Sequence, residues 1–165
     1  MNVSVKKINE LLPKTLLVIL LAALPFVGAA KAQDNIDVTA KEWTQFNVYG
    51  SVKVEYRIQE CTSGRFVNSN MVFFRFSNLS SKNIAFKFRR EVYHDGKCDN
   101  CHEIDSDEHL FEVKLAANEV IEADPATITN NAFYVFSNWA RLVPGMTQVE
   151  LNGIKLVGVE SSILK

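Results

Sequence analysis

The stretch VYGSVKVEYRI, residues 48–58, decides the class of fold. Its even positions are apolar apart from Gly50, and its odd positions are mostly charged or polar. Side chains alternate between the two faces of a β-strand, so this pattern puts one face in a core and the other in solvent. We therefore expect a strand with one buried face over residues 48–58.

The same signals recur outward from this stretch. Residues 71–76 are apolar on both faces except at Arg75, which suits a central strand. Further strand patterns, separated by turn-forming residues, cover 84–93, 109–115, 120–121 and 133–139, with a last strand or hairpin over 149–159. Asn152-Gly153 is a candidate tight turn in that last segment. With seven or eight short strands and no helical period, we expect an antiparallel β-sandwich.

The N-terminal residues have the pattern of an export signal. Three lysines precede the apolar run 16–30, and Ala30-Lys31-Ala32 has the small residues of a cleavage site. The run is shorter than the roughly 20 apolar residues that span a bilayer, so we expect cleavage between Ala32 and Gln33 rather than a stable membrane anchor. The expected divisions are a signal peptide at 1–32, a polar lead-in at 33–46 and one domain at 47–165. The expected location is periplasmic or secreted.

The charge balance excludes one class of partner. Without residues 1–32 the chain keeps 14 basic and 18 acidic residues, a net charge near −4. Nucleic-acid binding needs a basic surface, so we expect no nucleic-acid partner. The acidic residues concentrate in a long polar loop expected at 94–108.

That loop contains Cys98-Asp99-Asn100-Cys101-His102, and the only other cysteine is Cys61. Thiols tend to oxidise outside the cytoplasm, so the leading interpretation is a structural disulfide. Cys98 bridging Cys101 is slightly favoured, and the alternative is Cys61 with either of them. Sequence alone does not decide the connectivity.

Two other interpretations of the loop are open. Cys-x-x-Cys-His is the attachment sequence of c-type haem, in which Cys98 and Cys101 would form thioethers and His102 would bind iron. The crowd of carboxylates and the lack of helical period after His102 weigh against haem. The other interpretation is a metal site, with zinc as the candidate ion. Its ligands would come from His94, Cys98, Cys101, His102 and His109.

Four features in order carry a resemblance to a known group. They are the strand ending in Cys61, Asn78-x-x-Ser81-Lys82-Asn83, the Cys-x-x-Cys pair, and Leu115-x-x-Asn118-Glu119. The chain resembles small exported bacterial proteins with an immunoglobulin-like sandwich domain and no assigned activity, over most of residues 48–159. Those relatives often carry a fourth cysteine where this chain has Asp124-Pro125, which implies that one cysteine here lacks a partner. They generally place no histidine after the second cysteine of the pair.

No catalytic constellation stands out in the sequence. Phe136 and Trp139 are expected in the core, with a ligand cleft as the minor alternative, and Arg89-Arg90 is expected at a solvated strand edge. The sequence therefore predicts a non-enzymatic exported module without a cofactor, which binds a protein or a glycan at the cell envelope. The alternative is a haem c or zinc protein that uses Cys98, Cys101 and His102.

Overall fold

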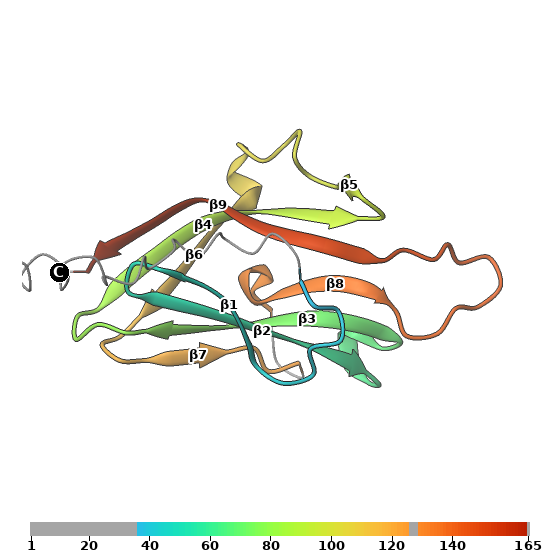
Figure 1. Cartoon of the computed structure of the whole chain (residues 1–165), viewed down its shortest axis with the longest axis horizontal. Helices are drawn as coiled ribbons and strands as arrows, with labels where there is room; N and C mark the ends of the chain where they lie inside the picture. The colour runs from blue at the N-terminus through green and yellow to red at the C-terminus, as the bar shows by residue number, and fades with distance from the viewer. Residues whose placement is uncertain (1–35, 126–128, 165) are drawn as a thin grey trace, which may run out of the picture. The chain divides into compact units, whose positions relative to one another are not determined.

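The computed structural model describes residues 36–125 and 129–164, so the expected signal peptide lies outside the described residues. Within these described ranges every element is a strand or a short 3-10 turn (Figure 1). The strands are β1 Thr44–Tyr49, β2 Val52–Cys61, β3 Ser69–Asn78, β4 Ile84–His94, β5 Lys97–Cys98, β6 Leu110–Leu115, β7 Val120–Glu122, β8 Tyr134–Trp139 and β9 Leu151–Ile163. The 3-10 turns are η1 Gly64–Phe66, η2 Asp107–His109 and η3 Asn131–Phe133.

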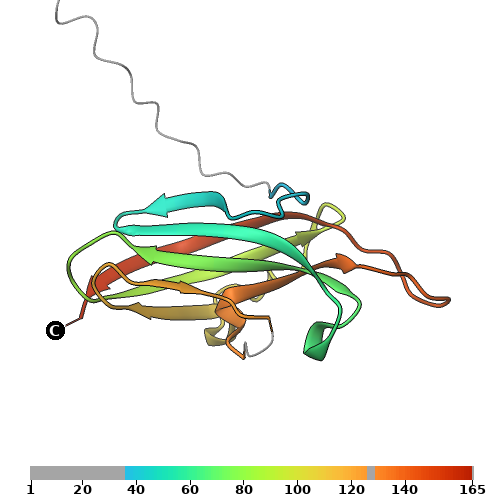
Figure 2. The same cartoon turned by 90° about the horizontal axis from the view of Figure 1, so that it is seen from below.

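The strands form two antiparallel sheets that lie in separate layers (Figure 2). In the first sheet, β3 pairs with β2 along one edge, β1 pairs with β2, and β7 and β8 share the other edge of β3. In the second sheet, β4 pairs with β9 along one edge, and β6 and β5 share its other edge. The prediction of an all-β, sandwich-like chain with antiparallel strands is confirmed.

Phenylalanines of the two central strands hold the layers together. The ring of Phe76 on β3 lies 5.9 Å from that of Phe86 and 5.7 Å from that of Phe88, both on β4. All three side chains are almost completely buried. Burying a phenylalanine contributes about 1.5–3 kcal/mol through the hydrophobic effect, so this aromatic layer is a main stabilising feature of the domain.

The stretch that decides the fold class is two strands rather than the expected one. The chain reverses at Gly50, whose φ of +59° is easy only for a residue without a side chain. Val48, before the reversal, is 41% exposed, whereas Val52 and Val54 after it are fully buried. Apolar residues occupy even positions both before and after the turn at Gly50. The alternation in the sequence is therefore unbroken and does not indicate that the chain reverses there.

The domain also begins earlier than the boundary expected at residue 47. Strand β1 starts at Thr44, and Ile36 and Ala40 within the expected polar lead-in are buried. The backbone N–H of Ile58 donates to the carbonyl of Ala40 at 2.6 Å. These contacts attach residues 36–40 to β2.

The expected turn at Asn152-Gly153 is wrong, because both residues lie inside the single strand β9. The tight turn is Asp95-Gly96 instead, with φ values of +49° and +74°, and it joins β4 to β5. Positive φ at two successive residues is the geometry that favours Asp-Gly in two-residue hairpins. The side chain of Asn152 accepts a hydrogen bond from the N–H of Gly96 at 2.6 Å, so it supports the neighbouring turn.

Candidate functional site

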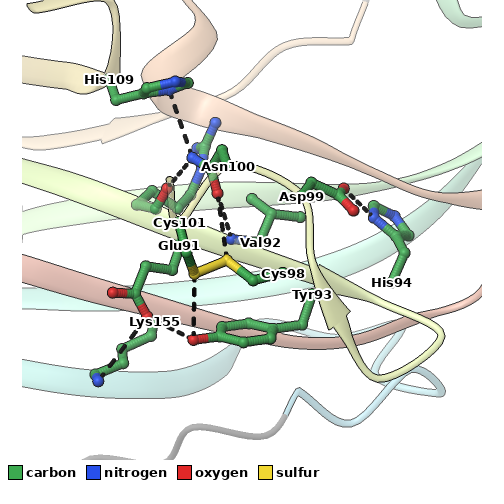
Figure 3. Close-up of a disulfide and its surroundings, with 11 residues drawn as sticks. Glu91, Val92, Tyr93, His94, Cys98, Asp99, Asn100, Cys101, His109 and Lys155 are labelled. Carbon is green, nitrogen blue, oxygen red and sulfur yellow. Dashed lines mark hydrogen bonds and ion pairs between the residues drawn. A yellow bond between two sulfur atoms is a disulfide. The ribbon is translucent and has the colours of Figure 1, made fainter. Parts of the chain in front are cut away.

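A disulfide joins Cys98, the last residue of β5, to Cys101 (Figure 3). Their Cα atoms lie 5.7 Å apart, which is ordinary for a disulfide. This is the pairing that the sequence slightly favours over a link to Cys61. Cys61 is a free, buried thiol, and burial raises its pKa.

The two residues inside the disulfide ring complete the edge of β4. Strand β6 pairs with β4 only as far as Arg89, and β5 pairs with β4 only at Tyr93 and His94. Between them, the side chain of Asn100 accepts from the N–H of Val92 at 3.1 Å and donates to the carbonyl of Arg90 at 2.7 Å. The N–H of Asp99 donates to the carbonyl of Val92 at 2.8 Å. The ring thus satisfies backbone groups that no strand reaches.

Asp99 also connects the disulfide loop to the opposite sheet through His94. The Nδ1 atom of His94 lies 2.6 Å from Oδ2 of Asp99, and its Nε2 atom lies 3.1 Å from the carbonyl oxygen of Phe136 on β8. Through these two contacts His94, on β4, links the disulfide loop to β8.

The structure does not bring the haem or metal candidates together. Cys98 and Cys101 are joined to each other, so neither offers a thiolate in this form. His102 is 71% exposed and lies near Glu103, while His109 contacts Asn100. In the described part of the chain, no three histidine, cysteine or acidic side chains are grouped as metal ligands. The residues present therefore do not fit a haem or zinc centre in the oxidised form.

A groove of about 990 Å³ lies beside this loop and is lined by both sheets. One wall comes from η1, β3 and β8, and the other comes from β4, the disulfide loop and the start of β6. Its aromatic side chains are only partly buried; they are Phe66, Phe111, Tyr134, Phe136 and Trp139. Phe136 and Trp139, expected in the core, form part of this wall with their rings 4.9 Å apart.

Arg90 lies at the groove and is only 7% exposed, so the expectation of a solvated strand edge is wrong for this residue. Its even parity with Phe86 and Phe88 turns it toward the opposite sheet. Its guanidinium donates to the carbonyls of Ala132 at 3.4 Å and Asn131 at 3.1 Å. Burial lowers its pKa to about 10, since a cation is disfavoured away from water.

Comparison with known proteins does not identify this site. The chain matches no protein-family model, no curated protein and no solved structure. No helix within residues 36–125 and 129–164 is both long and apolar enough to cross a membrane.

Sequence reasoning offered only Phe136 and Trp139 for a ligand cleft, as a minor alternative, because the groove residues come from separate regions, 65–71, 90–111 and 131–139. One signal was available within β8. Tyr134 and Phe136 share one face of that strand, and Val135 and Ser137 share the other, which is the buried one. Apolar residues on both faces of a strand usually indicate a central strand, so this pattern predicts apolar surroundings for Tyr134 and Phe136 but not the place of β8 beside β3 alone.

Proposed function

We propose that this protein is a non-enzymatic module of the cell envelope that binds a protein or a glycan in the groove beside the disulfide. We further propose that the domain is immunoglobulin-like and that residues 1–32 export it as a cleaved signal peptide. One observation carries the binding proposal. Five partly exposed aromatic side chains line a hollow between the sheets, where a folded domain would ordinarily bury them.

The composition of the groove suits recognition. Aromatic rings offer large apolar faces at low entropic cost, and a few polar groups among them orient a ligand. Here the polar groups include His94, Asp99 and Asn100, all held by hydrogen bonds. The disulfide limits the motion of the loop that carries Asp99 and Asn100. Such preorganisation reduces the entropy lost on binding.

The cysteine chemistry favours binding over turnover. Cys98 and Cys101 are consumed in the disulfide, and the buried thiol of Cys61 has a raised pKa, which lowers the fraction of reactive thiolate at neutral pH. The disulfide also supports an oxidising compartment, as the export pattern at 1–32 does. Intact mass of protein recovered from outside the cytoplasm tests export, and a mass that retains residues 1–32 would contradict cleavage.

The binding proposal is tested with arrays of envelope glycans and of peptides, followed by titration of each hit in solution. Trp139→Ala should weaken binding by at least about tenfold, since aromatic contacts dominate recognition sites. Trp43→Ala is the matched control, because the Trp43 ring contacts the guanidinium groups of Arg57 and Arg75, each 4.6 Å from its centroid, and does not line the groove. Equal losses in the two variants, or no hit on either array, would overturn the proposal.

A further inference from the structure

Two buried nitrogens at the groove lack a hydrogen-bond partner. They are Nε of Arg90 and Nε2 of His109, and both residues line the groove. Buried polar atoms are nearly always satisfied in folded proteins, and exceptions often mark the position of a missing ligand or ion. Arg57 and Arg89 also have an unpaired Nε, but neither lines this groove.

The charge of Arg90 is also uncompensated. Across the described ranges, no carboxylate lies within ion-pair distance of its guanidinium. The contacts it does make are two backbone carbonyls and the faces of Phe111 and Phe74, whose centroids lie 4.7 and 5.8 Å from its Cζ atom. Buried charges are normally paired with an opposite charge.

The acidic residues that line the groove do not provide that opposite charge. Asp99 is within 2.6 Å of His94, and Glu108 is exposed. The remaining groove residues are neutral or basic, and Arg65 adds a second cation on the η1 side. The interior of the groove therefore complements an anion that the domain does not contain.

We propose that the ligand of this groove is an acidic peptide segment, whose aspartate or glutamate carboxylate pairs with Arg90. Apolar side chains beside that carboxylate pack against Phe136 and Trp139. This inference rests on the proposed binding function and deepens it, because it names the class of ligand. His109 also lines the groove; its Nε2 atom makes no hydrogen bond and lies 4.0 Å from Oε2 of Glu103, and when protonated it has a hydrogen bond to donate to the ligand.

The depth of Arg90 favours a peptide over a glycan. A carboxylate that reaches an arginine with 7% exposure must extend on a flexible stem, as a glutamate side chain does, while the rest of the ligand stays at the aromatic rim. The carboxylate of an acidic sugar is attached directly to its ring. To bring that carboxylate to Arg90, the whole ring would have to enter the buried part of the groove. The carbonyl of Phe136 already has a hydrogen bond to His94, so it is not free to pair with the backbone of a peptide strand added beside β8. Recognition at Phe136 therefore depends on the side chains of the peptide.

The test compares two capped tripeptides, one with glutamate between leucine and phenylalanine and one with glutamine in its place. The wild-type protein should bind the glutamate peptide at least about tenfold more tightly, and the preference should shrink as salt is added. The NMR signal of the Arg90 Nε–H should shift with the glutamate peptide and stay in place with the glutamine peptide.

Variants at two neighbouring arginines then locate the carboxylate. Arg90→Met should remove the preference for glutamate, Arg90→Lys should keep part of it, and Arg89→Met should keep all of it, since Arg89 has the opposite parity on β4. If Arg90→Met does not fold, the titration of Arg90→Lys and the NMR shift of the wild-type protein still show whether the carboxylate pairs with Arg90.

The outcomes separate this inference from the proposed function. Equal binding of the two peptides, with loss in Trp139→Ala, would leave the groove as a binding site and overturn the acidic ligand. A shift of the Arg90 signal by a disaccharide containing glucuronic acid, but not by the glutamate peptide, would overturn the choice of a peptide. Absence of binding by every probe, including the arrays, would remove both proposals.

Discussion

Arg75 lies on β3 and Arg90 on β4, the central strands of the two sheets, and their surroundings differ completely. Arg75 donates from Nε to Oε2 of Glu55 at 2.9 Å, and its Nη2 lies 2.9 Å from Oε1 of the same carboxylate. Trp43 stacks on it at 4.6 Å, and Glu122 lies 3.8 Å away. Arg90 has no carboxylate among the described residues, only carbonyls and aromatic faces.

The difference shows how a small domain can use one residue type for stability and for recognition. Burial raises the pKa of Glu55, but the hydrogen bonds from Arg75 and Lys53 outweigh it, so the net shift is downward. The site at Arg75 is therefore complete within the fold. The site at Arg90 is not, and it lies beside a hollow that a ligand can enter.

The largest change in stability is expected from breaking the ion pair between Arg75 and Glu55. Glu55→Gln should lower the free energy of unfolding at pH 7 by about 2–3 kcal/mol, because it leaves Arg75 and Lys53 without their partly buried carboxylate. Since the folded-state pKa of Glu55 lies below its ordinary 4.5, this stabilisation is complete above pH 4.5 and disappears as the pH falls through the folded-state pKa. Urea denaturation of both proteins between pH 3 and 7 measures it.

Glu112→Gln is the control for that measurement. Glu112 pairs with Lys87 at 3.4 Å on the exposed surface, so its loss should cost less than about 0.5 kcal/mol. A cost for Glu55→Gln as small as this control, or one that persists at pH 3, would show that the Arg75 site is not held by its ion pair.

Removing the disulfide should affect the groove beside Arg90 and leave the ion pair of Arg75 with Glu55 intact. Cys98→Ser combined with Cys101→Ser should cost about 2 kcal/mol, the loop-entropy value for so small a ring. Because Asp99 and Asn100 then lose their restraint, binding in the groove should weaken as well. Chemical denaturation and peptide titration measure the two effects. Cys61→Ala should leave binding unchanged, and an equal loss of binding there would argue against a local role for the disulfide.

Asn100→Ala isolates the part of the loop that completes β4. We expect a loss of about 1.5 kcal/mol, because the N–H of Val92 and the carbonyl of Arg90 lose their partner. Hydrogen exchange should become faster at Val92. Asn152→Ala, which removes one exposed hydrogen bond to Gly96, should cost less and leave Val92 protected. Unchanged exchange at Val92 in Asn100→Ala would contradict the role of the side chain.

The smallest change in stability is expected at Arg90 itself. Arg90→Met should alter the free energy of unfolding by no more than about 1 kcal/mol, because removing an uncompensated buried charge offsets the loss of two hydrogen bonds to carbonyls. Thermal and urea unfolding measure it. A loss larger than that of Glu55→Gln would mean that Arg90 is mainly a link between the sheets.

Much of the fold was predictable because alternation reports directly on which residues share a face of a strand. The alternation in β2, β4 and β6 predicted their buried faces. The errors fell at turns. Gly50 preserves the parity of the pattern while reversing the chain, and Asn152-Gly153 has turn chemistry but lies in a strand paired with β4. Asp95-Gly96 carried the same signal and was the real turn.

The sequence by itself determined the all-β class, the approximate strands and the short spacing that makes a local disulfide geometrically easy. Only the tertiary structure decided which rings form a groove, that Arg90 is buried without a counter-charge, and that Asp99 and Asn100 serve β4 and His94. The physical reason is the separation along the sequence of the residues that interact. Alternation and Cys-x-x-Cys spacing act between residues a few positions apart, whereas the surroundings of Arg90 bring together segments more than 40 positions apart, joined only when two sheets pack.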